Sequence, residues 1–341
     1  MPLIQEGSRK ASANTSRFGI EEAMNVAVME MGRSGGGLLA ILGHVGEFGV
    51  AVGVAALLIA LLYLKKVEQL KLAKSREWPR SRVISFLLGI LSVIVGLVWP
   101  IPGLTMTSFS AHAGQHILVM NIAPLLLAMG APMTLLLQTS SRPIKRRILS
   151  ILHSRAFRYA HFPPLVWLLY YGSMYLFFLT PLFSKIMDPS AMYRMDIANS
   201  VFFVFGAVFW WPVVDVDPIP FWRLSPAARA AALLLGIPLN TFLGLSLTQF
   251  TSPIAPMYTM GTTRAGADFL WGSGELVSLL PLARVYVDWM RSDRRKGERA
   301  ERERGNPVRA ESSLPTREDE FDLSSAWERA WRQRGGGIPH E

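Results

Sequence analysis

Long apolar runs recur along this chain, and they constrain its fold more than any other feature of the sequence. Half of the 341 residues are hydrophobic and only 18% are charged. A helix that crosses about 30 Å of hydrocarbon needs about 20 mainly apolar residues. A helix also satisfies its own backbone hydrogen bonds where no water is present. The sequence therefore predicts an all-α integral membrane protein.

We expect about seven membrane-spanning helices. Their predicted ranges are Gly37–Tyr63, Arg82–Pro100, Ser110–Leu137, Phe162–Leu182, Asp196–Val214, Ala227–Phe250 and Ala267–Met290. The bundle then occupies residues 37–290, after an N-terminal extracytoplasmic segment (1–36) and before a charged, mostly disordered cytoplasmic tail (291–341). Residues 1–36 contain no apolar core after a basic start, so we expect no cleavable signal peptide.

The basic residues alternate between the predicted loops and so predict the orientation of the bundle. The loops after the first and third spans are rich in Lys and Arg, whereas residues 101–109 contain neither. Basic loops face the cytoplasm. The N-terminus is therefore expected outside and the C-terminus inside a multi-pass plasma-membrane protein. The net charge of +10 follows this pattern, and no nucleic-acid-binding motif accompanies it.

The chain contains no cysteine, so a metal site would have to use other ligands. His112, His116 and Met120 are spaced by four residues, which places them on one stripe of an α-helix. Two imidazoles can hold one metal ion, and a thioether suits a soft ion such as Cu(I). The alternative is a pair of interfacial histidines hydrogen-bonded to neighbours, with Met120 as packing. The spacing alone leaves both interpretations open.

Other polar residues lie inside the predicted spans. An ionisable side chain in hydrocarbon costs several kcal/mol unless it is paired, hydrated or bound to something. The residues concerned are His44 and Glu47 in the first span, Tyr171 in the fourth, Asn240 in the sixth, and Asp268 and Glu275 in the seventh. Each alone is compatible with a structural role. Together they favour a cation site or a polar cavity that opens to the outside.

The segment around the two histidines belongs to a series of sequence segments whose order along the chain is recognisable. The series comprises Phe109–Met120, Ala123–Leu127 and Gly130–Pro132, with support from Gly206–Val213, Asp217-Pro218, Trp271–Glu275 and Asp288–Arg295. It resembles the signature of the multi-pass CtaG family, assembly factors of haem–copper cytochrome c oxidase, and is closest to the actinobacterial type. The resemblance covers roughly Trp99 to Arg295. It implies a role in copper supply, with His112 and His116 as copper ligands.

The chain also departs from the family pattern. Ala113 stands where the family often has Met, and Tyr170 or Tyr171 falls where a histidine of the fourth span is usual. Asn199 and Asn240 occupy the regions of two further family histidines. The chain therefore offers fewer imidazoles to a copper ion than the family pattern does.

These observations predict an assembly factor rather than an enzyme, because no nucleophile–base arrangement is apparent. We expect it to hold or deliver Cu(I) outside the membrane and to contact cytochrome c oxidase subunits and the lipid bilayer. The expected ligands are His112 and His116, with Met120 and His44 as possible additions; the supporting residues are Asp268, Glu275, Glu47, Tyr171 and Asn240.

Two alternatives remain. The first is a metal-free accessory subunit of a respiratory membrane complex, which the absent histidines favour. The second is a transporter of copper or another small cation. It ranks last, because the predicted inner half of the bundle has few buried ionisable groups.

Overall fold

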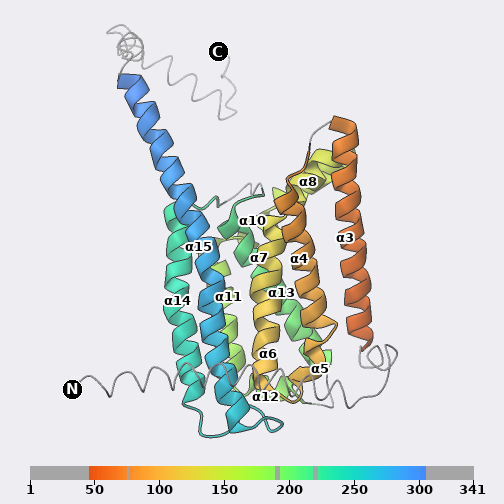
Figure 1. Cartoon of the computed structure of the whole chain (residues 1–341), viewed down its shortest axis with the longest axis vertical. Helices are drawn as coiled ribbons and strands as arrows, with labels where there is room; N and C mark the ends of the chain where they lie inside the picture. Colours follow the sequence, from red (N-terminus) through yellow and green to blue (C-terminus); the bar gives the residue numbers. More distant parts are fainter. Residues whose placement is uncertain (1–45, 75–76, 189–192, 218–221, 305–341) are drawn as a thin grey trace, which may run out of the picture. The chain divides into compact units, whose positions relative to one another are not determined.

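A computed structural model describes residues 46–74, 77–188, 193–217 and 222–304. All regular structure in these ranges is helical (Figure 1). Two compact units divide the chain between Val285 and Tyr286, inside one long helix. The larger unit contains the predicted bundle as far as Val285, and the two units are considered separately below.

The first half of the bundle is built from α3 and α4 and from a long interrupted segment. These elements are α3 (Glu47–Lys74), α4 (Arg80–Leu97), α5 (Ile101–Thr105), α6 (Phe109–His116), the π-helix η1 (Ile117–Ile122), α7 (Ala123–Met129) and α8 (Pro132–Thr139). The second half contains α9 (Arg142–Leu152), α10 (Arg155–Ala160), α11 (Pro163–Phe178), α12 (Leu182–Ile186), α13 (Tyr193–Val214), α14 (Pro226–Thr248) and α15 (Met260–Arg304).

Five segments of the described chain are long and apolar enough to cross a membrane. They are Glu47–Ala73, Arg80–Thr105, Phe109–Thr139, Tyr193–Val214 and Pro226–Thr248. These correspond to the first, second, third, fifth and sixth predicted spans. The fourth falls short because α11 has only 16 residues. The seventh corresponds to part of α15, whose sequence carries many charged residues. Seven spans and their orientation therefore remain predictions.

The interrupted segment from α6 to α8, called the central segment below, packs between α4 and α13 through its η1 and α7 parts. α4 packs against α6, η1 and α7, and α13 packs against η1 and α7 (Figure 1). The contacts are close where small residues face the partner: Gly206 of α13 packs directly on the Met120 carbonyl, and Gly89 of α4 packs on Leu127. Small residues at such contacts are typical of membrane helices, because they let backbones approach.

Proline and glycine interrupt this central segment. Pro124 has no N–H for the Met120 carbonyl four residues earlier, and the π-helix η1 lies immediately before this region. Farther along, Ala131 adopts a left-handed conformation (φ 52°) between α7 and α8. Pro132 then begins α8. The segment is therefore a series of short helices rather than one straight rod.

Asp217 caps the start of α8 from the loop after α13. Its carboxylate accepts hydrogen bonds from Met133 N (3.1 Å), Thr134 N (2.7 Å) and Thr134 Oγ1 (2.5 Å). The residue at the cap position itself, Ala131, has no side-chain oxygen to offer. Burial raises the pKa of the Asp217 carboxyl, and the hydrogen bonds from Thr134 and Met133 act in the opposite direction.

We expect Asp217→Ala to lower the free energy of unfolding by about 1–3 kcal/mol, since two helix N–H groups lose their acceptor. Thermal unfolding of the detergent-solubilised chain measures this change. The exposed Asp293→Ala is the control and should change stability by less than about 0.5 kcal/mol. Equal unfolding temperatures for the two variants would contradict the capping role.

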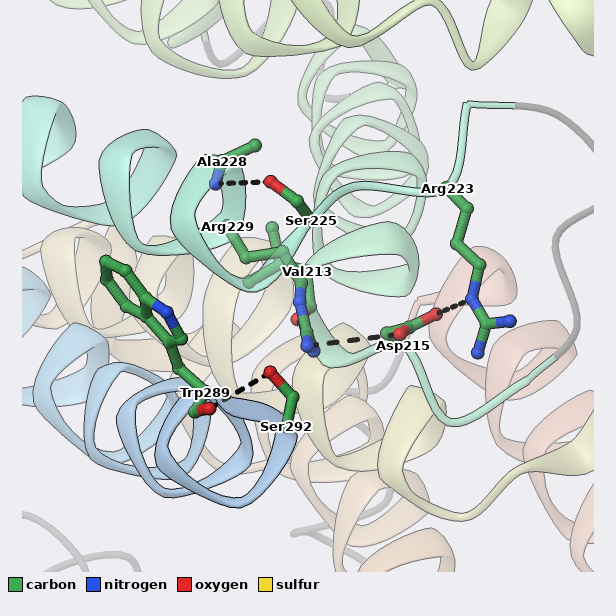
Figure 2. A network of polar contacts seen from close by, with 8 residues as sticks. All are labelled: Val213, Asp215, Arg223, Ser225, Ala228, Arg229, Trp289 and Ser292. Carbon is green, nitrogen blue, oxygen red and sulfur yellow. Dashed lines mark hydrogen bonds and ion pairs between the residues drawn. The ribbon is translucent and has the colours of Figure 1, made fainter. Parts of the chain in front are cut away.

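Asp215 occupies the same loop and joins the end of α13 to the start of α14. Its carboxylate lies 3.4 Å from Arg223 Nε and 3.9 Å from Arg229 Nη2, and Figure 2 shows it between the two side chains. Arg229 is only 5% exposed and also donates to the Val213 carbonyl at 3.4 Å. Because a buried arginine keeps its charge, this carboxylate is needed to stabilise it.

In the smaller unit, α15 continues from Tyr286 to Arg304. The beginning of the predicted disordered tail is therefore helical. Arg294 and Glu298 form a pair one turn apart, with Nε and Oε1 separated by 3.2 Å, which supports an exposed helix of this composition. The rest of that tail (305–341), the predicted N-terminal segment (1–36) and the first residues of the first predicted span (37–45) lie outside the described residues.

Candidate functional site

His112 and His116 form a closely spaced pair in the larger unit. Both lie on α6, where a spacing of four residues places them on one face. Their Nε2 atoms are 3.1 Å apart, and their ring centroids are 4.9 Å apart. The side chains are 0% and 1% exposed, so the pair is fully buried.

Phenylalanine rings enclose the pair. Phe183 meets His112 edge-on at 4.9 Å between centroids, and Phe202 meets His116 edge-on at 4.6 Å. Phe177 and Phe178 also contact both imidazoles, and Phe109 stacks on His112. These five residues, the phenylalanine box, come from α6, α11, α12 and α13. The box surrounds the pair with apolar walls and keeps bulk water away from it.

The outer nitrogens of the pair have no partner. Neither His112 Nδ1 nor His116 Nδ1 has a hydrogen-bond partner in the described structure, although both atoms are buried. Buried polar groups are usually satisfied, so each exception needs an explanation. Histidines that bind a resident metal normally donate their second N–H to a carboxylate, carbonyl or water. No carboxylate or carbonyl of the described residues supplies such a bond to either histidine.

The two Nε2 atoms, which face each other, fit either of two arrangements. A separation of 3.1 Å suits one Nε2–H donating to the other ring. It also allows both nitrogens to lie about 2 Å from one metal ion. No cluster of three or more His, Asp or Glu side chains is present among the described residues, so this part of the chain supplies only two such ligands.

Met120 lies on the π-helix η1, whereas the histidines lie on α6. It is 1% exposed and lines a cavity of about 20 Å³ together with Asn121, Tyr170, Tyr171 and Asn240. The histidines do not line this cavity. The predicted stripe assumed α-helical geometry from His116 to Met120, whereas the chain follows a π-helix there. Its wider turn changes the direction in which Met120 projects.

The small cavity is polar on one side. The Tyr170 hydroxyl donates to Asn121 Oδ1, and the Asn240 amide lies nearby beside Gly274. A cavity of about 20 Å³ is large enough for one water molecule. Asn121, Tyr170, Tyr171 and Asn240 thus form a neutral polar cluster in the core, around a cavity that the histidine pair does not line.

None of the predicted acidic residues in the described part of the chain hydrogen-bonds to the imidazoles. Glu275 accepts a hydrogen bond from Thr241 Oγ1, which pairs α15 with α14. Asp268 is exposed on α15, and Glu47 is exposed at the first residue of α3. His44 lies outside the described residues. The structure therefore places His112 beside His116. It separately brings Met120, Tyr171 and Asn240 together around the small cavity.

Sequence reasoning overlooked the phenylalanine box and the Asn121–Tyr170 bond. The box combines residues from four separate helices, so no single segment shows it. One signal was present in the sequence: Phe177 and Phe178 are adjacent at the end of the fourth predicted span, and Phe183 follows five residues later.

Comparison with known proteins identifies the relatives of this chain. A family model described as cytochrome c oxidase caa3 assembly factor (Caa3_CtaG) matches residues 61–292. Uncharacterized proteins of Mycobacterium bovis and Mycobacterium tuberculosis are each 25% identical over 276 residues. One of Mycobacterium leprae is 24% identical over 274 residues.

Each of these matches covers 75% of this chain but 41% of the relative, so the chain spans about two fifths of their length. No solved structure matches the chain. The matched family region contains the histidine pair, the phenylalanine box and the small cavity.

Proposed function

This chain belongs to the family of cytochrome c oxidase caa3 assembly factors, and we propose that it holds Cu(I) for delivery to the oxidase. The observation that carries the proposal is the buried histidine pair, whose Nε2 atoms converge at 3.1 Å. Copper is cargo in this proposal, not a resident cofactor. The protein acts as an assembly factor and carries out no covalent chemistry of its own.

The surroundings of the pair suit a soft ion that must be released again. Imidazole nitrogen binds copper well, and the phenylalanine box excludes water that would compete for the ion. The unpartnered Nδ1 atoms mean that few bonds fix the rings in a metal-binding orientation. A site with two histidines and little support binds weakly enough to pass its ion on. Met120 and His44 are the further ligands in this proposal.

The proposal includes a topology. Seven helices cross the plasma membrane with the N-terminus outside, so that α6 begins near the outer surface and the pair lies in the outer half of the bilayer. The distribution of basic loops supports this orientation. Copper would then be held on the extracytoplasmic side, with oxidase subunits as partners.

A second candidate function is that of a metal-free partner of the oxidase during its assembly. The unpartnered Nδ1 atoms and the absence of a third His, Asp or Glu ligand in the described chain favour it. In that case one histidine donates to the other, and the pair only packs the core. The family role in oxidase assembly is retained under either function.

The copper content of the oxidase distinguishes the two functions. In cells of the native host that lack this protein, we expect the oxidase to contain less copper per haem, and added copper in the medium to restore part of its activity. Elemental analysis and haem spectra of the purified oxidase measure the ratio. If oxidase yield falls while the copper-to-haem ratio stays normal, the copper proposal fails and the metal-free function is supported.

A further inference from the structure

Two short helices, α9 and α10, lie between a candidate membrane span and α11. The candidate span ends at Thr139 and α9 begins at Arg142. Figure 1 shows α8 and α10 toward the same end of the larger unit, opposite to α5 and α12. α9 has 11 residues and α10 has 6, whereas a helix that crosses a bilayer needs about 20. These two helices therefore do not cross the bilayer, but they directly follow a segment that is suited to crossing it.

α9 has an apolar side that the described protein covers only in part. Ile144, Ile148 and Ile151 are four and three residues apart, which places them on one side of the helix. The side chains of Ile144 and Ile151 are 50% and 65% exposed. Arg146 lies on the opposite side, since about 3.6 residues complete one turn. Exposed apolar residues opposite basic ones are typical of helices that lie in the membrane interface.

The basic residues of α9 have no acidic partners among the described residues. Arg142, Lys145, Arg146 and Arg147 are all exposed, and none of them forms an ion pair with a described residue. α9 and α10 themselves contain no Asp or Glu. Like charges four residues apart, such as Arg142 and Arg146, destabilise a helix. Anions from outside the chain would relieve this repulsion.

α10 packs against α9 and adds further basic and aromatic groups. Tyr159 of α10 is 69% exposed, and Trp222, which precedes α14, is 39% exposed. Trp222 Nε1 donates to the Arg158 carbonyl at 2.9 Å, and the Arg158 guanidinium lies 5.6 Å from the centre of the indole ring. Tyrosine and tryptophan are enriched where lipid headgroups meet acyl chains. The exposed rings and bases thus match the two layers of a membrane interface.

We propose that α9 and α10 form a surface that binds anionic phospholipid headgroups. The basic side chains contact the phosphates, and Ile144 and Ile151 enter the boundary of the acyl chains. Charge selects an anionic lipid over a neutral one. The exposed isoleucines select a lipid over free phosphate, which would leave them in water. The proposal rests on the segment Phe109–Thr139 crossing the membrane and does not depend on copper binding.

The first test measures the lipid selectivity of the full chain, purified in mild detergent and given equimolar phosphatidylglycerol and phosphatidylcholine. Native mass spectrometry counts each retained lipid, and wild type is expected to retain more phosphatidylglycerol. Replacing Lys145, Arg146 and Arg147 with glutamine should lower the retained ratio of phosphatidylglycerol to phosphatidylcholine about tenfold, because each base near an anionic surface strengthens binding. All three side chains are exposed, so the variant should fold normally.

The matched control removes three positive charges at another place. Lys296, Arg299 and Arg302 are exposed on α15, where acidic residues lie among them. Glutamine at these three positions should leave the lipid ratio unchanged. Equal ratios for the two triple variants would overturn the proposal. Displacement of phosphatidylglycerol by an equal concentration of inorganic phosphate would also overturn it, because that result identifies an ion site instead of a lipid surface.

The second test locates α9 relative to the bilayer. The chain has no cysteine, so Ile151→Cys and Ser150→Cys each provide a single site for a fluorescent label. Ser150 is exposed on the basic side of α9. In phosphatidylglycerol vesicles, a quencher on the acyl chains should quench the label at 151 more than the label at 150, and aqueous iodide should show the opposite order.

Two results of the quenching experiment would overturn the proposal. Equal access of iodide to both positions would show that α9 stands away from the membrane. Protection of position 151 from both quenchers would show that a protein covers the apolar side of α9 instead of lipid.

Discussion

Replacing both His112 and His116 with alanine is expected to lower oxidase activity to that of cells that lack the protein. The pair supplies the two converging nitrogens on which the copper proposal rests. Complementation of such cells, followed by oxygen consumption and the copper-to-haem ratio of the oxidase, measures the effect. A variant with phenylalanine at both positions should lose activity equally. It keeps an aromatic ring at each position but removes every nitrogen.

His153→Ala is the control for the loss of a histidine as such. His153 is exposed, and its Nδ1 bonds to the Leu149 carbonyl of its own helix, so activity should be unchanged. If the double phenylalanine variant accumulates in the membrane and supports full oxidase activity, the histidines have no role in copper handling. Folding of both double variants is checked by their amounts in the membrane fraction.

Gly206→Ala is expected to destabilise the bundle by about 1–3 kcal/mol or more, although alanine is normally the better helix residue. A Cβ at this position would overlap the Met120 carbonyl oxygen and would lie 2.9 Å from Pro124 Cγ. Backbone and a proline ring cannot move aside easily, so α13 would have to shift away from the central segment. Thermal unfolding of the detergent-solubilised chain measures the loss.

Gly272→Ala is the control, and its expected change in stability has the opposite sign. Gly272 also lies within a helix, but a Cβ there meets nothing within 4 Å. This variant should therefore be neutral or slightly stabilised, by up to about 1 kcal/mol. Similar unfolding temperatures for the two variants would show that α13 does not pack on the central segment as described.

Much of the architecture could be predicted from the sequence because it depends on local composition. Apolar runs such as the one in α13 signal a membrane helix without any knowledge of their neighbours. The same reasoning was weaker for α11 and α15. The first is short, and the second continues from an apolar part into a charged one, so hydropathy alone does not decide their status. The resemblance to the CtaG family is confirmed by the family match.

The site was predictable only where local geometry decides it. A spacing of four residues was sufficient to place His112 beside His116. For Met120 the assumed α-helical geometry does not hold, because a π-helix follows His116. The partner of Glu275, Thr241, and the phenylalanine box depend on packing between helices distant in sequence. No periodicity within a single segment contains that information.

The measurement that tests the central claim most directly is the Cu(I) stoichiometry of the purified full chain, determined by elemental analysis after loading and desalting. Wild type should retain about one copper per chain, and the variant with alanine at 112 and 116 should retain none. The absence of copper from wild type, or equal copper in the two proteins, would contradict a copper site at the histidine pair.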